Sequence, residues 1–180
     1  MTTCRDFDVR DMFKFNNVNL DPLTETYGFN FYLQYFLNWP EYFQVCEHYT
    51  GQIMGYIMGK AEGRDESFHG HVTALTVAPQ YRRLSLAARM MRFLEDVSES
   101  KKCKFVDLFV RVSNDVACSL YKKLGYVIYR RITNYYSGSS VSGQSEEDAF
   151  DMHKALSSDP QKKSEIPIPN PVSCNDIEFN

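Results

Sequence analysis

Residues 75–90 read LTVAPQYRRLSLAARM, and the order of residue types in this stretch decides the fold. The apolar run that opens it stops at Pro79, which has no backbone N–H for a strand. A basic loop follows, and apolar residues then recur at helical spacing over residues 86–100. This strand-loop-helix order points several backbone N–H groups and a positive helix end at one place, which suits a pyrophosphate, and Arg82 and Arg83 add charge there. The alternative is an ordinary helix start with a solvated arginine pair.

The rest of the chain alternates between strand and helix patterns. Strands are expected at residues 42–47, 52–60, 69–77, 105–110, 126–136 and 150–153, and helices at 8–15, 30–38, 86–100 and 115–124. A turn is expected at Thr50-Gly51, and Gly125 should end the last helix in a left-handed conformation. This order predicts an α/β (α+β) fold with helices on the faces of a mixed sheet. The expected sheet core is Ile57, Leu75, Val77, Val106, Leu108 and Val110.

Composition limits the class of protein. The chain has 180 residues, of which 43% are hydrophobic and 24% charged, so a sizeable core can form. We expect one domain at residues 1–156 and an extended, proline-containing tail at 157–180, because alternating prolines disfavour helix and sheet hydrogen bonds. A net charge of −3 gives no support for direct nucleic-acid binding. No apolar stretch suits a bilayer span or a signal peptide, so we expect a cytoplasmic protein without membrane contact.

The spacing of the cysteines and one polar segment give two further expectations. The five cysteines are scattered at positions 4, 46, 103, 118 and 174. They form no CxxC pair and no Cys/His cluster with metal-ligand spacing, so we expect free thiols in a reducing compartment and no metal. Residues 137–148 (SGSSVSGQSEED) are rich in Ser, Gly and acid, which predicts a loop.

Two signatures resemble those of the GNAT acetyltransferases. Val77-Ala78-Pro79 with residues 82–87 (RRLSLA) is similar to the family's acetyl-CoA loop, whose pattern is Arg/Gln-x-x-Gly-x-Gly/Ala, and residues 114–126 are similar to its second signature. Further segments resemble the catalytic subunits of N-terminal acetyltransferase B (NatB) complexes, over roughly residues 1–170. These segments are residues 19–28, 31–35, 39–43, 69–75 and 109–114, and the Tyr135-Tyr136 pair.

The resemblance implies a fold and an activity. The fold would be a GNAT fold, with a mixed, mostly antiparallel sheet of about seven strands flanked by helices. The enzyme would transfer acetyl from acetyl-CoA to proteins beginning Met-Asp, Met-Glu, Met-Asn or Met-Gln. It would work with a large helical-repeat auxiliary subunit at the ribosome. Cofactor binding would fall to Leu75, Val77, Arg82, Arg83, Ser85, Leu86, Ala87, Asn114 and Tyr121.

Catalysis by this route needs no strong base, because an α-amine titrates near 7.7–8.0 and a minority is neutral at pH 7. Tyr121 is the expected acid for the leaving thiolate, or else a core tyrosine, and Asn114 either binds substrate or cofactor or caps a helix. His71 and Thr73 share a strand face and could bind the second residue's side chain or a water, or be structural. His48 and His153 are expected at the surface.

The channel for the peptide is expected at the loop before residues 30–38 and at the paired tyrosines. A carboxylate at Glu25 could hold the incoming ammonium, and Gly28 would let the peptide backbone approach. Tyr135 and Tyr136 would wall the channel, or else cap a sheet edge. The expected substrate-binding residues are Glu25, Tyr27, Gly28, His71, Thr73, Tyr135 and Tyr136.

Ser85 departs from the family pattern, which has glycine there. Glycine would be needed either for a positive φ, where serine costs roughly 1–2 kcal/mol, or for close approach to phosphate, where a hydroxyl can donate a hydrogen bond. Serine is also a good helix N-cap. We expect acetyl-CoA binding that is weaker than in a glycine version. Two other functions stay open: a GNAT enzyme for lysine or small amines, and a catalytically silent binding subunit of the complex.

Overall fold

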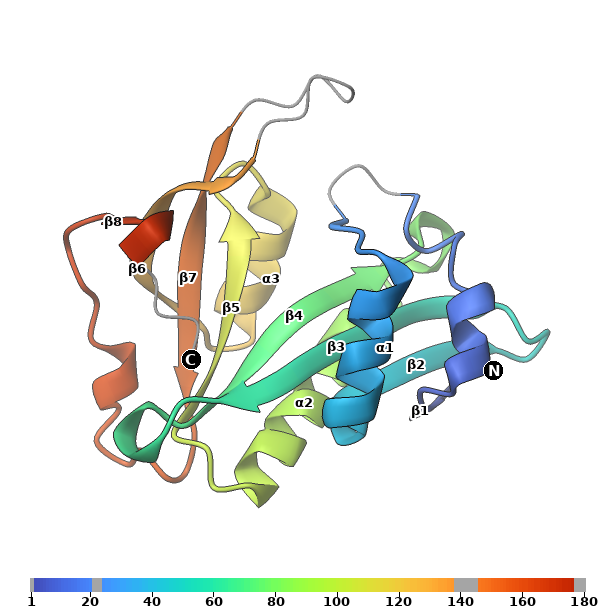
Figure 1. Ribbon diagram of the computed structural model, residues 1–180, viewed down its shortest axis with the longest axis horizontal. Coiled ribbons are helices and arrows are strands. Elements are labelled where there is room, and N and C mark those ends of the chain that lie inside the picture. The colour runs from blue at the N-terminus through green and yellow to red at the C-terminus, as the bar shows by residue number, and fades with distance from the viewer. Residues whose placement is uncertain (1, 21–23, 138–145, 177–180) are drawn as a thin grey trace. The chain divides into compact units, whose positions relative to one another are not determined.

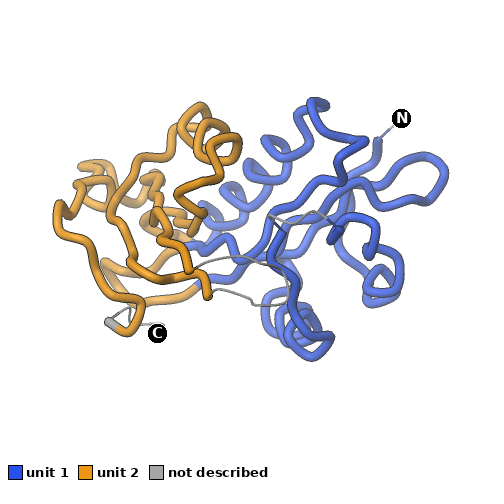
Figure 2. Tube along the Cα trace, turned by 90° about the horizontal axis from the view of Figure 1, so that it is seen from above, with its two compact units in different colours: residues 1–61, 70–101 blue, residues 62–69, 102–180 orange. Residues whose placement is uncertain are grey.

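The computed structural model describes residues 2–20, 24–137 and 146–176 (Figure 1). Within these residues it holds eight strands and three α-helices, which confirms the α/β (α+β) class. Two of the strands, at residues 2–6 and 172–173, lie outside the six expected ranges. The chain forms two compact units (Figure 2). Unit 1 consists of residues 1–61 and 70–101, and unit 2 of residues 62–69 and 102–180. No described helix is both long and apolar enough to cross a membrane.

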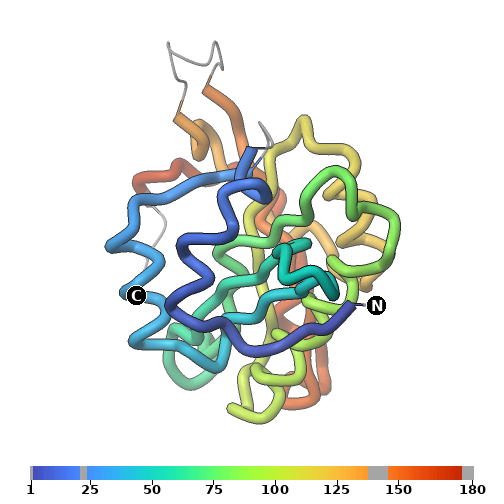
Figure 3. The backbone as a smooth tube through the Cα atoms, turned by 90° about the vertical axis from the view of Figure 1, so that its right-hand side faces the viewer, coloured from blue at the N-terminus to red at the C-terminus, as the bar shows by residue number. Residues whose placement is uncertain are grey.

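Unit 1 is built on four strands, apart from the strand ends that reach into unit 2. Their order is β1 (Thr2–Asp6), β2 (Phe43–His48), β3 (Ile53–Glu62) and β4 (His69–Val77). The first three are antiparallel neighbours. The predicted turn between β2 and β3 is confirmed, since Gly51 has φ 84° and its N–H donates to the His48 carbonyl. Figure 3 follows the chain from β1 to the first helix.

Two helices cover opposite faces of these strands (Figure 2). Tyr32 of α1 (Phe29–Asn38) contacts the Tyr56 hydroxyl of β3 at 3.3 Å. A Cβ at Gly59 of β3 would lie 2.6 Å from Leu94 of α2 (Leu86–Ser100), so glycine allows that helix to approach. Because positions 56 and 59 point to opposite faces of a strand, α1 and α2 lie on opposite sides.

The predicted helix at residues 8–15 is instead a short 3-10 helix, η1 (Val9–Phe13). Asp8 caps it by accepting the Arg10 N–H at 2.9 Å, and Asp11 accepts both the Asp8 N–H and the Arg5 guanidinium. The side-chain bonds close a single tight turn, the usual length of a 3-10 segment. The short helix expected at residues 8–15 is therefore present only as a 3-10 turn, with narrower bounds than predicted.

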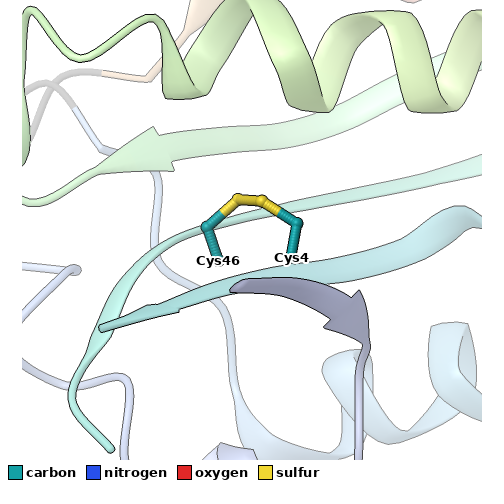
Figure 4. The surroundings of a disulfide bond; sticks show 2 residues. All are labelled: Cys4 and Cys46. Carbon is teal, nitrogen blue, oxygen red and sulfur yellow. A yellow bond between two sulfur atoms is a disulfide. The ribbon is translucent and has the colours of Figure 1, made fainter. Parts of the chain in front are cut away.

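Cys4 and Cys46 form a disulfide between β1 and β2 (Figure 4). They face each other directly in the antiparallel register, with Cα atoms 4.1 Å apart. The expectation that all five cysteines are free thiols is therefore wrong, because strand pairing brings together two residues separated by 42 positions. Cys103, Cys118 and Cys174 take no part in a disulfide.

Within its described residues, unit 2 carries the other four strands and one α-helix. The strand order is β5 (Phe105–Arg111), β7 (Glu147–Ala155), β6 (Val127–Tyr136) and β8 (Val172–Ser173). The β5–β7 and β6–β7 pairs are antiparallel and the β6–β8 pair is parallel. Helix α3 (Asp115–Lys123) ends as predicted, with Gly125 at φ 95°.

The strand expected at residues 150–153 is longer at both ends than predicted. The acidic pair that opens β7 is held in place, because the Glu147 carboxylate accepts the Ser113 N–H at 2.7 Å and Asp148 accepts the Asn134 N–H at 2.9 Å. Most of the expected loop at 137–148 lies outside the described residues, which resume at Glu146.

The tail from residue 157 packs along unit 2. The Ile168 N–H donates to the Tyr129 carbonyl at 2.7 Å, and Val172 and Ser173 pair with β6. Prolines at 167, 169 and 171 keep the backbone extended, yet Ile168 between them still donates a hydrogen bond, and the two residues after them pair with a strand. The expectation that sheet hydrogen bonds are denied here is wrong for these residues. Residues 177–180 of the expected tail lie outside the described residues.

The expected core is mostly confirmed. Ile57, Val106, Leu108 and Val110 are all buried. The prediction that Leu75 and Val77 belong to the core is wrong, since both are only half-buried.

Candidate functional site

The loop between β4 and α2 has an unusual backbone. After the 3-10 turn η4 (Pro79–Tyr81), Arg82 is extended and Arg83 has φ 66°. Ser85, directly before α2, has φ 60° and ψ 17°. Of the two reasons for a glycine at this position, the positive φ therefore applies. A left-handed serine is strained, so the surrounding loop must hold it in this conformation.

The start of α2 is open and electropositive. Residues 82–85 are exposed, Leu86 is buried and Ala87 is half-buried. In the described structure the Ser85 side chain makes no capping hydrogen bond, and the first turn holds no acidic residue. The first N–H groups of a helix have no partner within the helix. This end of α2, with Arg82 and Arg83 beside it, can therefore bind an anionic phosphate group.

One face of β4 carries His71 and Thr73, as predicted, together with Leu75 and Val77. His71, Thr73, Leu75 and Val77 are half-buried, between Val72 and Thr76, which are buried. Thr73 Oγ1 donates to the Tyr35 hydroxyl at 3.1 Å, so this threonine also has a structural role. The Val77 carbonyl accepts a long hydrogen bond from Arg82 Nε at 3.4 Å.

A run of aromatic rings links that face to the expected substrate loop. Tyr27 stacks on Phe31 with ring centroids 4.3 Å apart, and Phe31 packs on Tyr35, the partner of Thr73. Burial, together with the charge of Glu25, raises the pKa of Tyr27. Tyr35 was not among the predicted site residues, although the density of aromatic residues at 27–39 is a signal in the sequence that could have found this cluster.

Glu25 and Gly28 lie at the exposed end of the same loop. Gly28 is the N-cap of α1 with φ −66°, and a Cβ built there would meet no atom within 4 Å. Neither backbone conformation nor crowding within the chain therefore demands glycine at this position. The space beside it is available to a ligand. Residues 21–23 of the loop lie outside the described residues.

In unit 2, α3 carries the two residues predicted for the leaving-group side of the reaction. Asn114 is the N-cap, and its Oδ1 accepts the Ala117 N–H at 3.1 Å. Tyr121 is buried and packs edge-on to Tyr126 at 6.0 Å. Burial raises the pKa of Tyr121, so its phenol keeps its proton at neutral pH.

The predicted tyrosine pair lies on β6. Tyr135 packs edge-on to Phe109 at 4.9 Å, and the Tyr136 hydroxyl donates to the Phe109 carbonyl at 3.3 Å. The Arg111 guanidinium lies 4.0 Å from the centre of the Tyr136 ring. These contacts fix both rings on the sheet of unit 2, and both remain half-buried.

The predicted site residues therefore form two sets. In unit 1, the structure brings Tyr27 and Thr73 into one aromatic cluster. Arg82, Arg83 and Ser85 of the same unit lie in a separate loop, directly before α2. In unit 2, Asn114 and Tyr121 share one helix, and Tyr135 and Tyr136 share one strand end.

An ionic cluster in unit 2 was not predicted. His69 Nε2 lies 3.6 Å from Glu62 and 3.5 Å from Asp107. Burial disfavours a charged imidazole, but the Glu62 hydrogen bond and the Asp107 charge outweigh it and raise the pKa of His69 to about 9. The His69 ring stacks on Phe105, which stacks in turn on His153.

His153 is buried, so its expected place at the surface is wrong. It pairs opposite Asp107 in the β5–β7 register, its Nδ1 donates to the Ser164 carbonyl at 2.8 Å, and Tyr129 stacks on its ring. The packed tail and β6 thus cover a strand position that an isolated strand would expose.

One trio in this cluster has metal-ligand geometry. The ligand atoms of Asp107, Asp151 and His153 lie within 4.8 Å of one another, and all three residues are buried. However, Asp151 already contacts Arg130 Nε at 2.8 Å and His153 Nε2 at 2.9 Å. Because protein groups meet the carboxylate on both sides, we assign no metal to it.

Comparison with known proteins identifies the family. The model of the acetyltransferase (GNAT) family matches residues 9–126. The N-terminal acetyltransferase B complex catalytic subunit NAA20 of Arabidopsis thaliana is 52% identical over 181 residues, which covers all of both chains.

Two solved structures give the same result. Chaetomium thermophilum Naa20, in complex with a bisubstrate analogue, is 40% identical with a TM-score of 0.88, over 95% of this chain and 96% of that one. A chain of a NatB acetyltransferase complex bound to CoA and MES is 42% identical with a TM-score of 0.76, over 86% of this chain and 99% of that one. The chain belongs to the GNAT acetyltransferase family and, within it, to the NatB catalytic subunits.

Proposed function

We propose that this N-terminal acetyltransferase transfers acetyl from acetyl-CoA to the α-amines of proteins that begin Met-Asp, Met-Glu, Met-Asn or Met-Gln. It does so as the catalytic subunit of a NatB complex, with a large helical-repeat auxiliary subunit that brings it to nascent chains at the ribosome. The observation that carries the proposal is the loop at residues 82–85, with its exposed arginines, its left-handed serine and the open start of α2.

Acetyl-CoA supplies the acetyl group as an activated thioester. Arg82, Arg83 and the first amides of α2 hold its phosphates, in line with the CoA bound in a relative of 42% identity. Leu75 and Val77 line the path of its pantetheine arm along β4, and Leu86 and Ala87 pack where α2 begins. The loop suits the cofactor because arginine side chains and the first N–H groups of a helix both bind an anionic phosphate group.

The peptide end is held by the residues of the substrate loop and the tyrosine pair. Glu25 receives the ammonium, and the open space at Gly28 admits the peptide backbone. Tyr135 and Tyr136 offer the initiator methionine an apolar wall on β6, and Tyr27 contacts the peptide from the substrate loop. His71 and Thr73 bind the side chain of the second residue, or a water that takes the proton of the amine.

The proton for the departing thiolate comes from Tyr121. A free thiol has a pKa near 8.5, so a modest donor is sufficient. The Tyr121 phenol carries its proton at neutral pH, and because burial raises its pKa, it gives that proton up only as negative charge develops on the leaving sulfur. Asn114, as the cap of the same helix, holds that helix in place and hydrogen-bonds substrate or cofactor.

Peptide acetylation tests the proposal. The chain, with and without its auxiliary subunit, would be assayed on a peptide beginning Met-Asp-Glu-Leu, one beginning Met-Leu-Gly-Pro and a histone lysine peptide. We expect rapid acetylation of the first alone, and faster with the auxiliary subunit. Preference for the lysine peptide would favour the lysine or small-amine alternative.

Calorimetry with acetyl-CoA tests the silent-subunit alternative. No binding at millimolar acetyl-CoA would support a silent subunit and contradict the proposal. A Ser85→Gly variant should bind up to about tenfold more tightly, because strain and crowding at the loop are removed. Unchanged affinity in that variant would show that the serine does not weaken binding.

A further inference from the structure

Ser85 also completes a motif that acetyl transfer does not use. Residues 82–86 read Arg-Arg-Leu-Ser-Leu, with arginines three and two positions before the serine and an apolar residue after it. Basophilic protein kinases select such serines because carboxylates in their substrate groove pair with the two guanidinium groups. We propose that Ser85 is a phosphorylation site for a basophilic, ATP-dependent protein kinase, and that its phosphorylation blocks acetyl-CoA binding.

The structure leaves this segment accessible. All four residues from Arg82 to Ser85 are exposed, and they lie between η4 and α2, outside any helix or strand. The Ser85 side chain makes no capping hydrogen bond to α2 in the described structure. Its hydroxyl is therefore available as a phosphoryl acceptor.

The chain contains a matched sequence that the structure protects. Residues 130–133 read Arg-Arg-Ile-Thr, with the same spacing before a hydroxyl residue. They lie inside β6, where Arg130 and Arg131 contact Asp151 and Asp148 at 2.8 and 2.7 Å. The strand pairs with β7 on one side and β8 on the other. A kinase groove cannot take up this segment without breaking the sheet, so we expect modification at Ser85 and none at Thr133.

The phosphoryl step is balanced by ATP. A bond forms between Ser85 Oγ and the γ-phosphorus as the bond from that phosphorus to the β–γ bridging oxygen breaks. ADP leaves, and the hydroxyl proton passes to the catalytic aspartate of the kinase. No other reactant is required.

The expected loss of acetyl-CoA binding on phosphorylation of Ser85 rests on the proposed function. A phosphoserine adds a charge of about −1.5 to −2 at neutral pH, with oxygens that accept from Arg82, Arg83 and the first amides of α2. These are the donors assigned to the phosphates of acetyl-CoA. The modified side chain occupies them and repels a second phosphate group. Helix α2 itself is not weakened, because a negative charge at its N-terminus is favourable.

The test treats the full-length chain with Mg-ATP and the catalytic subunit of a cyclic-AMP-dependent protein kinase. Peptide mass spectrometry locates the phosphate, and calorimetry gives acetyl-CoA affinity before and after treatment. We expect near-stoichiometric phosphate on Ser85, none on Thr133, and affinity reduced by at least about 100-fold. The thermal midpoint of the modified chain should not fall, which separates a blocked site from an unfolded protein.

Ser85→Gly is the matched control, since treatment with the kinase should leave its mass and its acetyl-CoA affinity unchanged. An unmodified Ser85, or equal modification of Thr133, would overturn the proposed site. A phosphorylated Ser85 with unchanged affinity would overturn the block. If the untreated chain fails to bind acetyl-CoA, the proposed function fails, while the mass spectrum still decides whether Ser85 is a kinase substrate.

Discussion

Helices α2 and α3 both begin at a polar residue but use it in opposite ways. Asn114 turns its side chain to the Ala117 N–H and closes the first turn of α3. Ser85 is left-handed and caps nothing in the described structure, so the first turn of α2 stays open. The difference shows that a polar N-cap either satisfies a helix end or leaves it for a ligand, and that the backbone conformation decides which.

Basic residues show the same contrast between the α2 loop and the ionic cluster of unit 2. Arg82 and Arg83 are exposed in the α2 loop. In unit 2, Arg130 contacts Asp151, and His69 lies beside Glu62 and Asp107. Cations in unit 2 thus support the fold, whereas those at α2 remain accessible to an anion. Variants can test each half of this comparison.

Removing the Tyr121 hydroxyl should have the largest effect. If α2 binds the cofactor and α3 supplies the acid, Tyr121→Phe should lower kcat by about 10²–10⁴-fold, as expected for loss of a general acid. Acetyl-CoA affinity should change by less than about tenfold, because only one hydrogen bond is lost. Steady-state kinetics and calorimetry measure the two effects. Tyr126→Phe is the control on the neighbouring ring, and an unchanged kcat in Tyr121→Phe would remove Tyr121 from the mechanism.

The second-largest effect is expected from alkaline pH, which should weaken the ionic cluster around His69. The pKa of His69 is raised to about 9 in the folded chain from an ordinary value near 6.5. Its stabilisation is therefore complete below about pH 6.5 and is lost as pH rises through about 9, by up to about 3 kcal/mol. Urea unfolding at pH 6.5 and pH 9.5 measures the loss. His69→Gln should show a smaller decrease between the two pH values, and equal decreases would mean that His69 is not charged in the fold.

The exposed arginines should matter for binding alone. Arg82→Gln with Arg83→Gln should weaken acetyl-CoA binding by about 10–100-fold and reduce its dependence on salt, since two charge-assisted contacts are lost. The urea midpoint should stay unchanged. Arg131→Gln is the matched control, because this exposed arginine already contacts Asp148. Equal weakening by both variants would indicate a general charge effect.

The sequence predicted local features well and long-range ones poorly. The bounds of β4 and α2 were predicted correctly because strand alternation, Pro79 and the helical stripe are local signals. The Cys4–Cys46 bond and the buried His153 were missed because strand register and the covering tail decide them. The backbone of Ser85 could not be deduced, since positive φ and close approach both favour glycine.

Removing each N-cap side chain should give the smallest effect and the most direct test of the comparison. Asn114→Ala should lower the free energy of unfolding by about 1 kcal/mol, because the bond to the Ala117 N–H is lost. Ser85→Ala should change it by less than about 0.5 kcal/mol, because alanine is as strained as serine at φ 60° and no capping bond is lost. Urea unfolding of both variants measures the two changes in the free energy of unfolding. A loss at Ser85 equal to that at Asn114 would mean that serine does cap α2 in solution, and the open helix end assigned to the acetyl-CoA phosphates would then be partly closed.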